Sequence, residues 1–433
     1  MNILIIGNGG REHCLAWKIS QSKLVDKLYA IPGNAGISQV AKCENLPYAK
    51  ENFKDILQFI EKNNIDLTVV GPEAPLVDGI VDYLGKRGHL AFGPDEKAAQ
   101  IEGSKVFTKK LCMNYNIPTA KAVFFNKSEF DNAVSYINGL SDSKFPYVIK
   151  ADGLASGKGV IIAQNKKELL DALDSFFVEG KFGKSGEDIV IEDFISGFEV
   201  SLLCLCDGKM LIPLDLAQDY KKIFDQDNGK NTGGMGSYSP LPFIDSHLYE
   251  KILNKIVFPT FNALKLEKID YKGVLYAGVI VKENEPYLLE YNCRFGDPET
   301  QAVLPRLKDD IVPVLLNCIK GSLNSTKLNW EDKKTVCVVI ASKGYPESSS
   351  KGDIISGLGE IKSKKDVFVF HAGTKNAGDN VVTDGGRVLN VVAKAGTFKE
   401  ARKISYANIE KISFSGMQFR TDIALKVEET LDS

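Results

Sequence analysis

The sequence predicts a multidomain protein of mixed α/β and α+β class: a parallel α/β domain at the N-terminus, a central α+β block and a small β-rich domain at the C-terminus. Apolar runs alternate with helical stretches over about the first hundred residues, and strand-like runs follow one another after residue 101. A polar connector, SLNSTKLNWEDKK, then precedes a stretch rich in strand signals. Alternating strands and helices favour a parallel sheet, whereas strands beside strands favour an α+β block. A chain of 433 residues is long enough for several domains.

The N-terminal domain should contain four strands separated by three helices. The strand runs are NILIIG, KLYAIP, IDLTVVGPE and HLAFGP, and the helical stretches are 11–22, 51–64 and 76–88. Parallel sheets of this kind bind ligands beyond the carboxyl ends of their strands. Three strand ends carry glycine- or proline-containing loops, GNGGRE, PGNAG and GPEAP, and these loops are the expected binding edge.

The central block should begin with a helix at 103–116 and a glycine-rich hairpin at 146–163. A helix at 166–177 and strands at 188–196 and 198–208 follow, and a helix at 247–267 and a hairpin at 273–292 close the block. Between them, QDYKKIFDQDNGKNTGGMGSYSP is a long polar stretch of the kind that forms functional loops or stays disordered. The last domain should hold strands at 335–342, 366–373 and 386–396 and a helix at 397–412.

Composition indicates an ordinary soluble globular protein. The apolar fraction is 44%, the charged fraction is 25% and the formal net charge is -2, which argues against a general nucleic-acid binder. The eight cysteines are scattered and the four histidines form no ligand-spaced pair, so we expect reduced thiols and no zinc or iron chemistry. The N-terminus does not resemble a signal peptide and no segment is long and apolar enough for a membrane helix. We expect a cytoplasmic protein with small-molecule partners.

Two glycine-rich loops suggest phosphate binding without matching a standard nucleotide motif. GNGGREH lies between a strand and a helix, but Glu12 replaces the third glycine of the dinucleotide fingerprint, so NAD is not expected. Together with PGNAG and GPE it favours a phosphate-bearing sugar, with Glu73 suited to sugar hydroxyls. KADGLASGKG lacks Walker spacing and is followed by a strand. The segment predicts a hairpin tip that folds over a nucleotide, and a flexible surface turn is the alternative. Because Lys150 lies in an apolar strand, we expect it to have an anionic partner.

The segment YLLEYNCRFGDPET sets polar side chains into an apolar strand. Because side chains alternate between the two faces of a strand, Glu290, Asn292 and Arg294 should share one face. Taken alone, this pattern is also typical of a half-exposed strand with one solvated side.

The ordered set of motifs resembles the glycinamide ribonucleotide synthetase family of ATP-grasp ligases. The motifs are IGNGGREH, PGNAG, GPEAPL, GSKVFTK, KADGLASGKGV, NTGGMGSYSP and NCRFGDPETQ, and the resemblance runs from residue 1 to about 430. It implies an N-terminal pre-ATP-grasp domain at 1–101 that binds substrate and an ATP-grasp domain at 102–327 with a mobile lid at about 120–190. A small β-rich domain at 328–433 follows.

The resemblance also implies roles for particular residues. Lys150, Lys158 and Arg294 would act on the reacting groups, and Arg294 would hold the carboxylate of glycine, with an ion pair to Asp297 or Glu299 as the alternative role for this arginine. ATP would be bound by Lys105, Lys150, Gly157, Lys158, Gly159, Glu192, Phe194, Ile195 and Glu199. Magnesium or manganese would be bound by Glu290 and Asn292. The other substrate-binding positions would be Gly9, Gly10, Asn34, Gly36, Glu73, Asp215, Thr232 and Gly233.

The chain departs from the family pattern in two places. Tyr220 stands in QDYKK where relatives usually have histidine, which puts any proton-handling role at this position in doubt. Many ATP-grasp enzymes also take a metal-binding acid from the strand before the ligand strand, but VLYAGVIV offers none. The remaining metal ligands would come from ATP phosphates and water.

The implied reaction is ATP-dependent ligation of glycine to 5-phosphoribosylamine through glycyl phosphate, a step of purine biosynthesis, by an enzyme expected to be a monomer. Two alternatives are another ATP-grasp carboxylase or ligase, and a regulatory ATP-binding protein of the same fold without turnover. The second would be expected to lose phosphate-binding lysines or metal ligands, and this chain keeps them.

Overall fold

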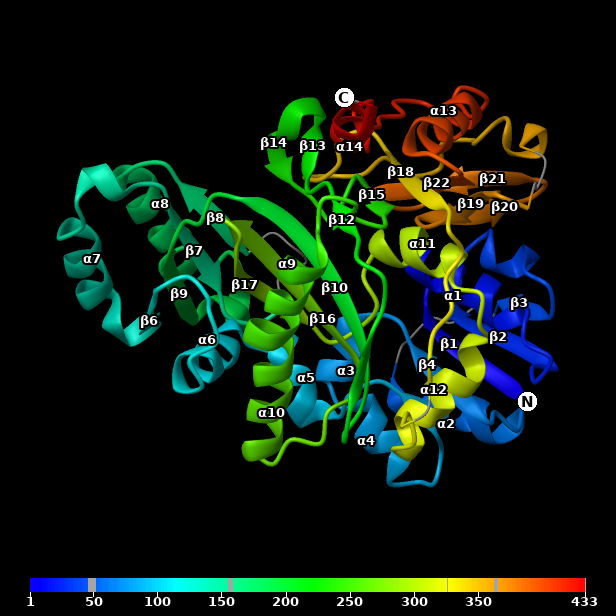
Figure 1. Ribbon diagram of the computed structural model, residues 1–433, viewed down its shortest axis with the longest axis horizontal. Coiled ribbons are helices and arrows are strands. Elements are labelled where there is room, and N and C mark those ends of the chain that lie inside the picture. Colours follow the sequence, from blue (N-terminus) through cyan, green and yellow to red (C-terminus); the bar gives the residue numbers. More distant parts are fainter. Residues whose placement is uncertain (46–51, 155–158, 325, 362–364, 433) are drawn as a thin grey trace.

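The computed structural model describes residues 1–45, 52–154, 159–324, 326–361 and 365–432, and it confirms the predicted fold class. The structure contains an N-terminal sheet, a four-stranded lid sheet, a central sheet and a C-terminal sheet (Figure 1). The lid stands to one side, whereas the C-terminal sheet lies against the N-terminal domain. No helix in these ranges is long and apolar enough to cross a membrane.

The N-terminal domain is a five-stranded parallel sheet of order β3-β2-β1-β4-β5. Its strands are β1 (Asn2–Gly7), β2 (Lys27–Pro32), β3 (Cys43–Asn45), β4 (Leu67–Val70) and β5 (Ala91–Phe92). Its helices are α1 (Gly10–Ser20), α2 (Phe53–Lys62), α3 (Glu73–Val77), α4 (Ile80–Gly85) and α5 (Glu96–Gly103). The edge strand β3 was not predicted, because three residues carry too little alternation to be recognised. The helix expected at 76–88 is interrupted at Gly79, whose φ of 82° lies outside the helical region.

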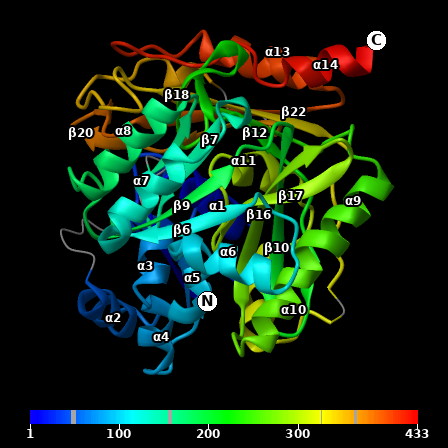
Figure 2. The same cartoon turned by 90° about the vertical axis from the view of Figure 1, so that its left-hand side faces the viewer.

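The lid is an antiparallel sheet of order β6-β9-β7-β8, covered on one side by two helices (Figure 2). The strands are β6 (Ala122–Asn126), β7 (Tyr147–Ala151), β8 (Val160–Ala163) and β9 (Asp188–Asp193), and the helices are α7 (Phe130–Asn138) and α8 (Lys166–Phe177). A separate apolar core, which includes Phe176, Phe177 and Ile149, holds these elements together. The lid therefore has the internal packing of a unit that can move as one body.

The central sheet has the order β11-β10-β16-β17. Its strands are β10 (Phe198–Asp207), β11 (Leu211–Pro213), β16 (Lys272–Lys282) and β17 (Glu285–Asn292). The accompanying helices are α6 (Lys105–Asn114), α9 (Ser246–Ile252), α10 (Phe258–Leu266), α11 (Glu299–Val303) and α12 (Ile311–Lys320). A π-helical turn, Leu253–Val257, joins α9 to α10, so the helix predicted at 247–267 is nearly continuous.

The C-terminal sheet, of order β12-β15-β18-β22-β19, takes two of its strands from the middle of the chain. These are β12 (Gln218–Asp219) and β15 (Gly236–Ser239), and the others are β18 (Lys334–Ala341), β19 (Val367–His371) and β22 (Arg387–Ala395). Two hairpins, β13 (Lys222–Phe224) with β14 (Asn228–Asn231) and β20 (Thr374–Ala377) with β21 (Asn380–Thr383), and helices α13 (Phe398–Ile409) and α14 (Leu425–Asp432) complete it. The polar stretch at 218–240 is thus ordered by pairing with the last domain.

Two buried histidines join the N-terminal and C-terminal domains. The backbone N–H of His371 donates to Nδ1 of His13 at 2.8 Å, and the rings lie 5.6 Å apart. Burial lowers the pKa of His371 to about 4, and burial together with His371 lowers the pKa of His13 well below its ordinary value. Both rings are therefore neutral near pH 7, and the His13 nitrogen can accept.

We expect the free energy of unfolding to fall as pH falls from about 6.5 to about 4. In this window the unfolded chain binds protons on these histidines while the folded chain does not, so acidification favours unfolding. The His371 shift alone corresponds to about 3 kcal/mol. Urea denaturation at a series of pH values checks this, with His371→Gln expected to flatten the curve and His247→Gln, at an exposed position, to leave it unchanged. Identical curves for the wild type and His371→Gln would contradict the assignment.

Candidate active site

Three charged side chains between the lid and the central sheet form a buried cluster. Glu192 on β9 is ion-paired with Lys150 on β7 and, at 2.5 Å, with Lys109 on α6. All three side chains are nearly inaccessible to solvent. Burial would raise the pKa of Glu192, but the two lysines outweigh it and lower the pKa. The anionic partner predicted for Lys150 is therefore Glu192.

The same cluster reaches the central strand β17 through backbone carbonyls. Lys150 donates to the carbonyl of Leu289 at 3.4 Å, while Lys109 contacts Thr119, whose hydroxyl donates to the carbonyl of Leu288 at 2.7 Å. These contacts join β7 and α6 to the strand that carries Glu290.

The N-terminus of α6 faces the start of the hairpin tip. Ser104 caps this helix, and its hydroxyl and the N–H of Val106 both contact Asp152, at 3.0 Å in each case. Lys105 donates to the carbonyl of Gly153 at 2.9 Å, and burial lowers the pKa of Lys105 despite the opposing effect of Glu290. Of the predicted tip residues, Gly159 is buried beside β7, whereas Gly157 and Lys158 lie outside the described residues.

Glu290 lies on the polar face of β17 opposite Lys221. The two side chains are 3.6 Å apart, and Lys221 also pairs with Glu199 of β10 at 3.0 Å. Lys221 first, and also Lys150 and Lys105, lower the pKa of Glu290 to about 2 although burial opposes this. Glu290 is therefore ionised at neutral pH among several cations.

A β-bulge in β17 decides which side chains face Lys221. Gly278 pairs with Glu290 and Val279 pairs with Leu288, so Leu289 is the extra residue. Before the bulge Pro286 and Leu288 are buried, and after it Tyr291, Asn292 and Cys293 are buried. The bulge interrupts the alternation at Leu289, which is half-buried although it lies two residues before the buried Tyr291.

The donor set fits a divalent cation that takes most of its ligands from phosphate and water. Glu290 offers an ionised carboxylate, and the amide oxygen of Asn292 on the same face already accepts from Arg294 at 2.9 Å. Within the described ranges no group of three or more His, Cys, Asp or Glu side chains could hold a metal alone. A carboxylate and an amide suit magnesium or manganese.

Arg294 is held by two carboxylates from the N-terminal domain. Its guanidinium lies 3.0 Å from Glu102 at the end of α5 and 3.3 Å from Glu73 at the start of α3. Burial would lower the pKa of Arg294, but Glu102 and Glu73 outweigh it and raise the pKa. The observed partners of Arg294 are thus Glu73 and Glu102, not Asp297 or Glu299.

The glycine loops of the N-terminal domain are closely packed around Glu12. The N–H of Gly9 donates to this carboxylate at 2.6 Å, and a Cβ at Gly71 would lie 2.1 Å from it. A Cβ at Gly10 would lie 2.3 Å from the side chain of Asn390 in the C-terminal domain. Glu12, which replaces the third glycine of the dinucleotide fingerprint, therefore fills the space between the ends of β1 and β4 with its side chain.

The second glycine loop is shaped by the Asn34 amide. It donates to the carbonyls of Asn8 and His371, at 2.8 Å each, and accepts from the N–H groups of Gly36 and Ile37. A Cβ at Gly36 would lie 2.3 Å from the ring of His13. Any contribution of Asn34 to substrate binding would come mainly through the shape of this loop.

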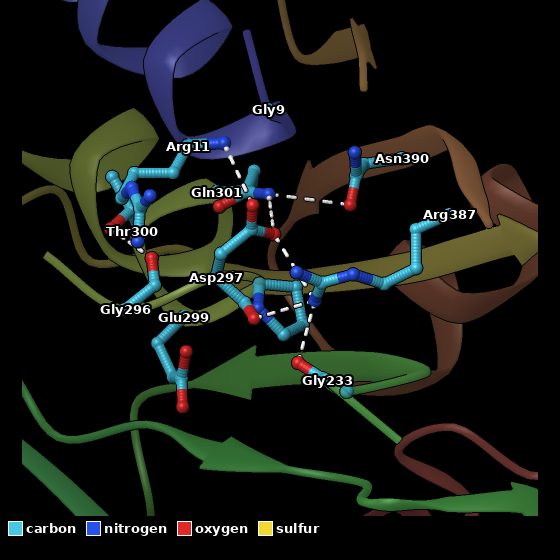
Figure 3. A network of polar contacts seen from close by, with 12 residues as sticks. Gly9, Arg11, Gly233, Gly296, Asp297, Glu299, Thr300, Gln301, Arg387 and Asn390 are labelled. Carbon is cyan, nitrogen blue, oxygen red and sulfur yellow. Dashed lines mark hydrogen bonds and ion pairs between the residues drawn. The ribbon is translucent and has the colours of Figure 1, made fainter. Parts of the chain in front are cut away.

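Asp297 connects all three domains (Figure 3). Its carboxylate accepts from the N–H of Arg11 at 3.3 Å and from Gln301 at 2.8 Å, and it lies 3.4 Å from Arg387 of the C-terminal domain. Burial would raise its pKa, but Arg387 and Arg11 lower it. Arg387 also binds the carbonyl of Gly233, next to Thr232, in the NTGGMG loop.

The remaining predicted residues occupy separate places. Phe194, 42% exposed, and Ile195 follow β9 at the lid edge, where the adenine segment is predicted. Asp215 pairs with Arg306 at 2.6 Å. Tyr220 packs into the C-terminal domain: its hydroxyl accepts from the N–H of Ala424 at 2.9 Å, and burial raises its pKa to about 12.

Several charged residues of the site were not singled out from the sequence. Lys221 could have been found, because it alternates with Asp219 in a polar stretch beside the NTGGMG loop. Local patterns give no comparable signal for the others, each of which has a partner far away in the sequence: Arg11, Glu102, Lys109 and Arg387.

Family models and curated relatives match the chain over nearly its whole length. Models described as phosphoribosylglycinamide synthetase match as the N domain at residues 1–102, the ATP-grasp (A) domain at 103–300 and the C domain at 335–426. A phosphoribosylamine–glycine ligase of Caldanaerobacter subterraneus is 47% identical over 424 residues, covering 98% of this chain and 99% of the relative. One from Neisseria meningitidis serogroup B is 45% identical, with the same coverage.

Solved structures give the same result. The phosphoribosylamine–glycine ligase of Thermotoga maritima matches with a TM-score of 0.84 and 32% identity, covering 98% of this chain and all of that one. Biotin carboxylase of Campylobacter jejuni matches with a TM-score of 0.74 and 14% identity, covering 99% of this chain and 95% of that one, and this shows a shared fold alone. The resemblance seen in the motifs is confirmed: the chain belongs to the phosphoribosylglycinamide synthetase family.

Proposed function

We propose that this protein ligates glycine to 5-phosphoribosylamine with ATP, forming glycinamide ribonucleotide, ADP and phosphate. The full-length likeness to phosphoribosylamine–glycine ligases carries the proposal. The site supports it, because lysines that suit phosphates lie beside an ionised carboxylate, and Arg294 contacts Glu73 in one of the loops of the N-terminal domain.

The chemistry must turn glycine's carboxylate, a poor electrophile, into glycyl phosphate that the amine can attack. Phosphoryl transfer depends mainly on positioning and charge neutralisation, so no protein nucleophile is required. Lys105 and Lys150 would neutralise phosphate oxygens. The hairpin tip would exclude water, which protects an acyl phosphate from hydrolysis.

Glu290 and Asn292 would hold Mg²⁺ or Mn²⁺, which, when bound, would neutralise charge on the phosphates of ATP. Arg294 would hold the glycine carboxylate, and the loops around Gly9, Gly36 and Glu73 would receive the phosphoribosyl group. For this role a part of the Arg294 guanidinium must remain available beside Glu73 and Glu102. We further propose that the protein acts as a monomer in the cytoplasm.

The expected result of an omission assay is ADP release that depends on glycine and is greatest when 5-phosphoribosylamine is also present. The physical reason is that the γ-phosphoryl group needs the glycine carboxylate as acceptor, while the amine drives the second step forward. The measurement is coupled ADP detection with each substrate left out in turn. Equal ATP turnover with and without glycine would contradict the ligase assignment, and ATP bound but unhydrolysed with all substrates present would indicate a regulatory protein.

A further inference from the structure

Arg387 at the start of β22 links the C-terminal domain to two loops of the ATP-grasp domain. Its Nη1 donates to the carbonyl of Gly233 at 2.6 Å and to the carbonyl of Asp297 at 2.7 Å, and lies 3.4 Å from the Asp297 carboxylate. Nη1 of Arg387 therefore holds the NTGGMG loop next to the DPET segment (297–300) (Figure 3).

The packing at both loops leaves little freedom. A Cβ at Gly233 would lie 3.1 Å from Cζ of Arg387, and the Gly233 N–H donates to the hydroxyl of Tyr345 at 2.9 Å. At the next residue, a Cβ on Gly234 would lie 2.4 Å from the Pro298 ring. The C-terminal domain thus binds Gly233 through both its N–H and its carbonyl.

Asp297 transmits this constraint to the N-terminal domain. Its Oδ2 accepts from the N–H of Arg11 and would lie 3.1 Å from a Cβ at Gly9. Gln301 donates to Asp297 and also, at 3.3 Å, to Asn390, whose side chain packs closely against Gly10. The loop that the proposed function assigns to the phosphoribosyl group is therefore positioned through Asp297, and Asp297 is positioned by Arg387.

We propose that Arg387 is a positioning residue for the amine substrate, so that the C-terminal domain governs the second half of the reaction. The inference rests on the proposed function. Arg387 contacts neither the Lys150–Glu192–Lys109 cluster nor Glu290 through any hydrogen bond or ion pair described here. Formation of glycyl phosphate should therefore be nearly independent of Arg387, while attack by the amine should depend on it.

The test compares Arg387→Ala with Arg402→Ala. Arg402, on α13 of the same domain, also binds backbone carbonyls and a carboxylate, with Ile423 and Glu428 as partners. We expect Arg387→Ala to lower kcat/KM for 5-phosphoribosylamine about 10²-fold, the loss that follows from displacing a substrate loop by about 1 Å. The KM for ATP should stay within about twofold, whereas Arg402→Ala should change neither constant appreciably.

Positional isotope exchange in ATP labelled at the β,γ-bridge isolates the first half-reaction, because it needs glycine but no amine. Exchange should persist in Arg387→Ala at near the wild-type rate. Arg387→Lys should recover part of the loss, since all the contacts use one nitrogen and a lysine ammonium can replace it.

Equal loss of exchange and of overall turnover in Arg387→Ala would overturn the inference, as would an effect no larger than that of Arg402→Ala. Absence of glycine-dependent ADP release in the wild type would instead contradict the proposed function, so the two failures are distinguishable.

Discussion

Replacing Glu290 by alanine is expected to lower kcat about 10³-fold, since one carboxylate would be lost from the cation site and from the electrostatic stabilisation of the transferred phosphoryl group. The fold should be retained, because the side chain is 41% exposed and Lys221 keeps Glu199 as a partner. Steady-state kinetics at a series of Mg²⁺ and Mn²⁺ concentrations would measure the effect. The cation concentration for half-maximal rate should rise as well.

Glu285 provides a matched control on the same strand. It is 40% exposed, pairs with Lys251 and Lys255, and has its pKa lowered to about 2, chiefly by hydrogen bonds from these two lysines. Glu285→Ala also removes a carboxylate from β17, but at the other end of the strand from Glu290 and its neighbour Lys221. It should leave kcat within about twofold of the wild type. A Glu290→Ala enzyme within tenfold of the wild type at saturating cation would show that this carboxylate is not a metal ligand.

Removing Arg294 is expected to raise the KM for glycine about 10²-fold, because the charged hydrogen bonds to a carboxylate would be lost. Arg294→Ala also leaves Glu102 buried without its cation. Breaking a buried ion pair costs about 3 to 5 kcal/mol of stability. Glycine kinetics and urea denaturation of the same variant measure the two effects separately.

The double variant Glu102→Gln/Arg294→Ala separates binding from stability. Glutamine removes the uncompensated charge while its oxygen can still accept from the N–H of Cys293, which donates to Glu102 at 2.7 Å. We expect most of the lost stability to return while the KM for glycine stays high. If the double variant also regains the wild-type KM for glycine, Arg294 acts only as a structural ion pair.

Local patterns were sufficient for most elements, because strands and helices leave hydrophobic periods in the sequence. The parallel sheet, the hairpin at 146–163 and the face shared by Glu290 and Asn292 were found in this way. The failures have a common origin in tertiary contacts. The stretch at 218–240 resembles a disordered loop because its strand β15 pairs with β18, which lies far along the chain in the last domain. The bulge at Leu289 leaves no periodic signal.

The sequence by itself determined the class of the protein, its ordered motifs and the residue types of the candidate site, since these depend on short-range patterns. The tertiary structure decided which charges meet: Lys150 with Glu192, Arg294 with Glu102, and Arg387 with Asp297. Lys150 and Glu192 meet across neighbouring strands of the lid sheet, whereas the other two pairs form between domains. Each pair depends on strands or surfaces that come together only in the folded chain, and the local periodicity of a segment does not record its partner. The motifs pointed to Glu290, Asn292 and Arg294 as a metal and glycine site, and the tertiary structure supplied their neighbours: Lys221 beside Glu290, and Glu73 and Glu102 beside Arg294.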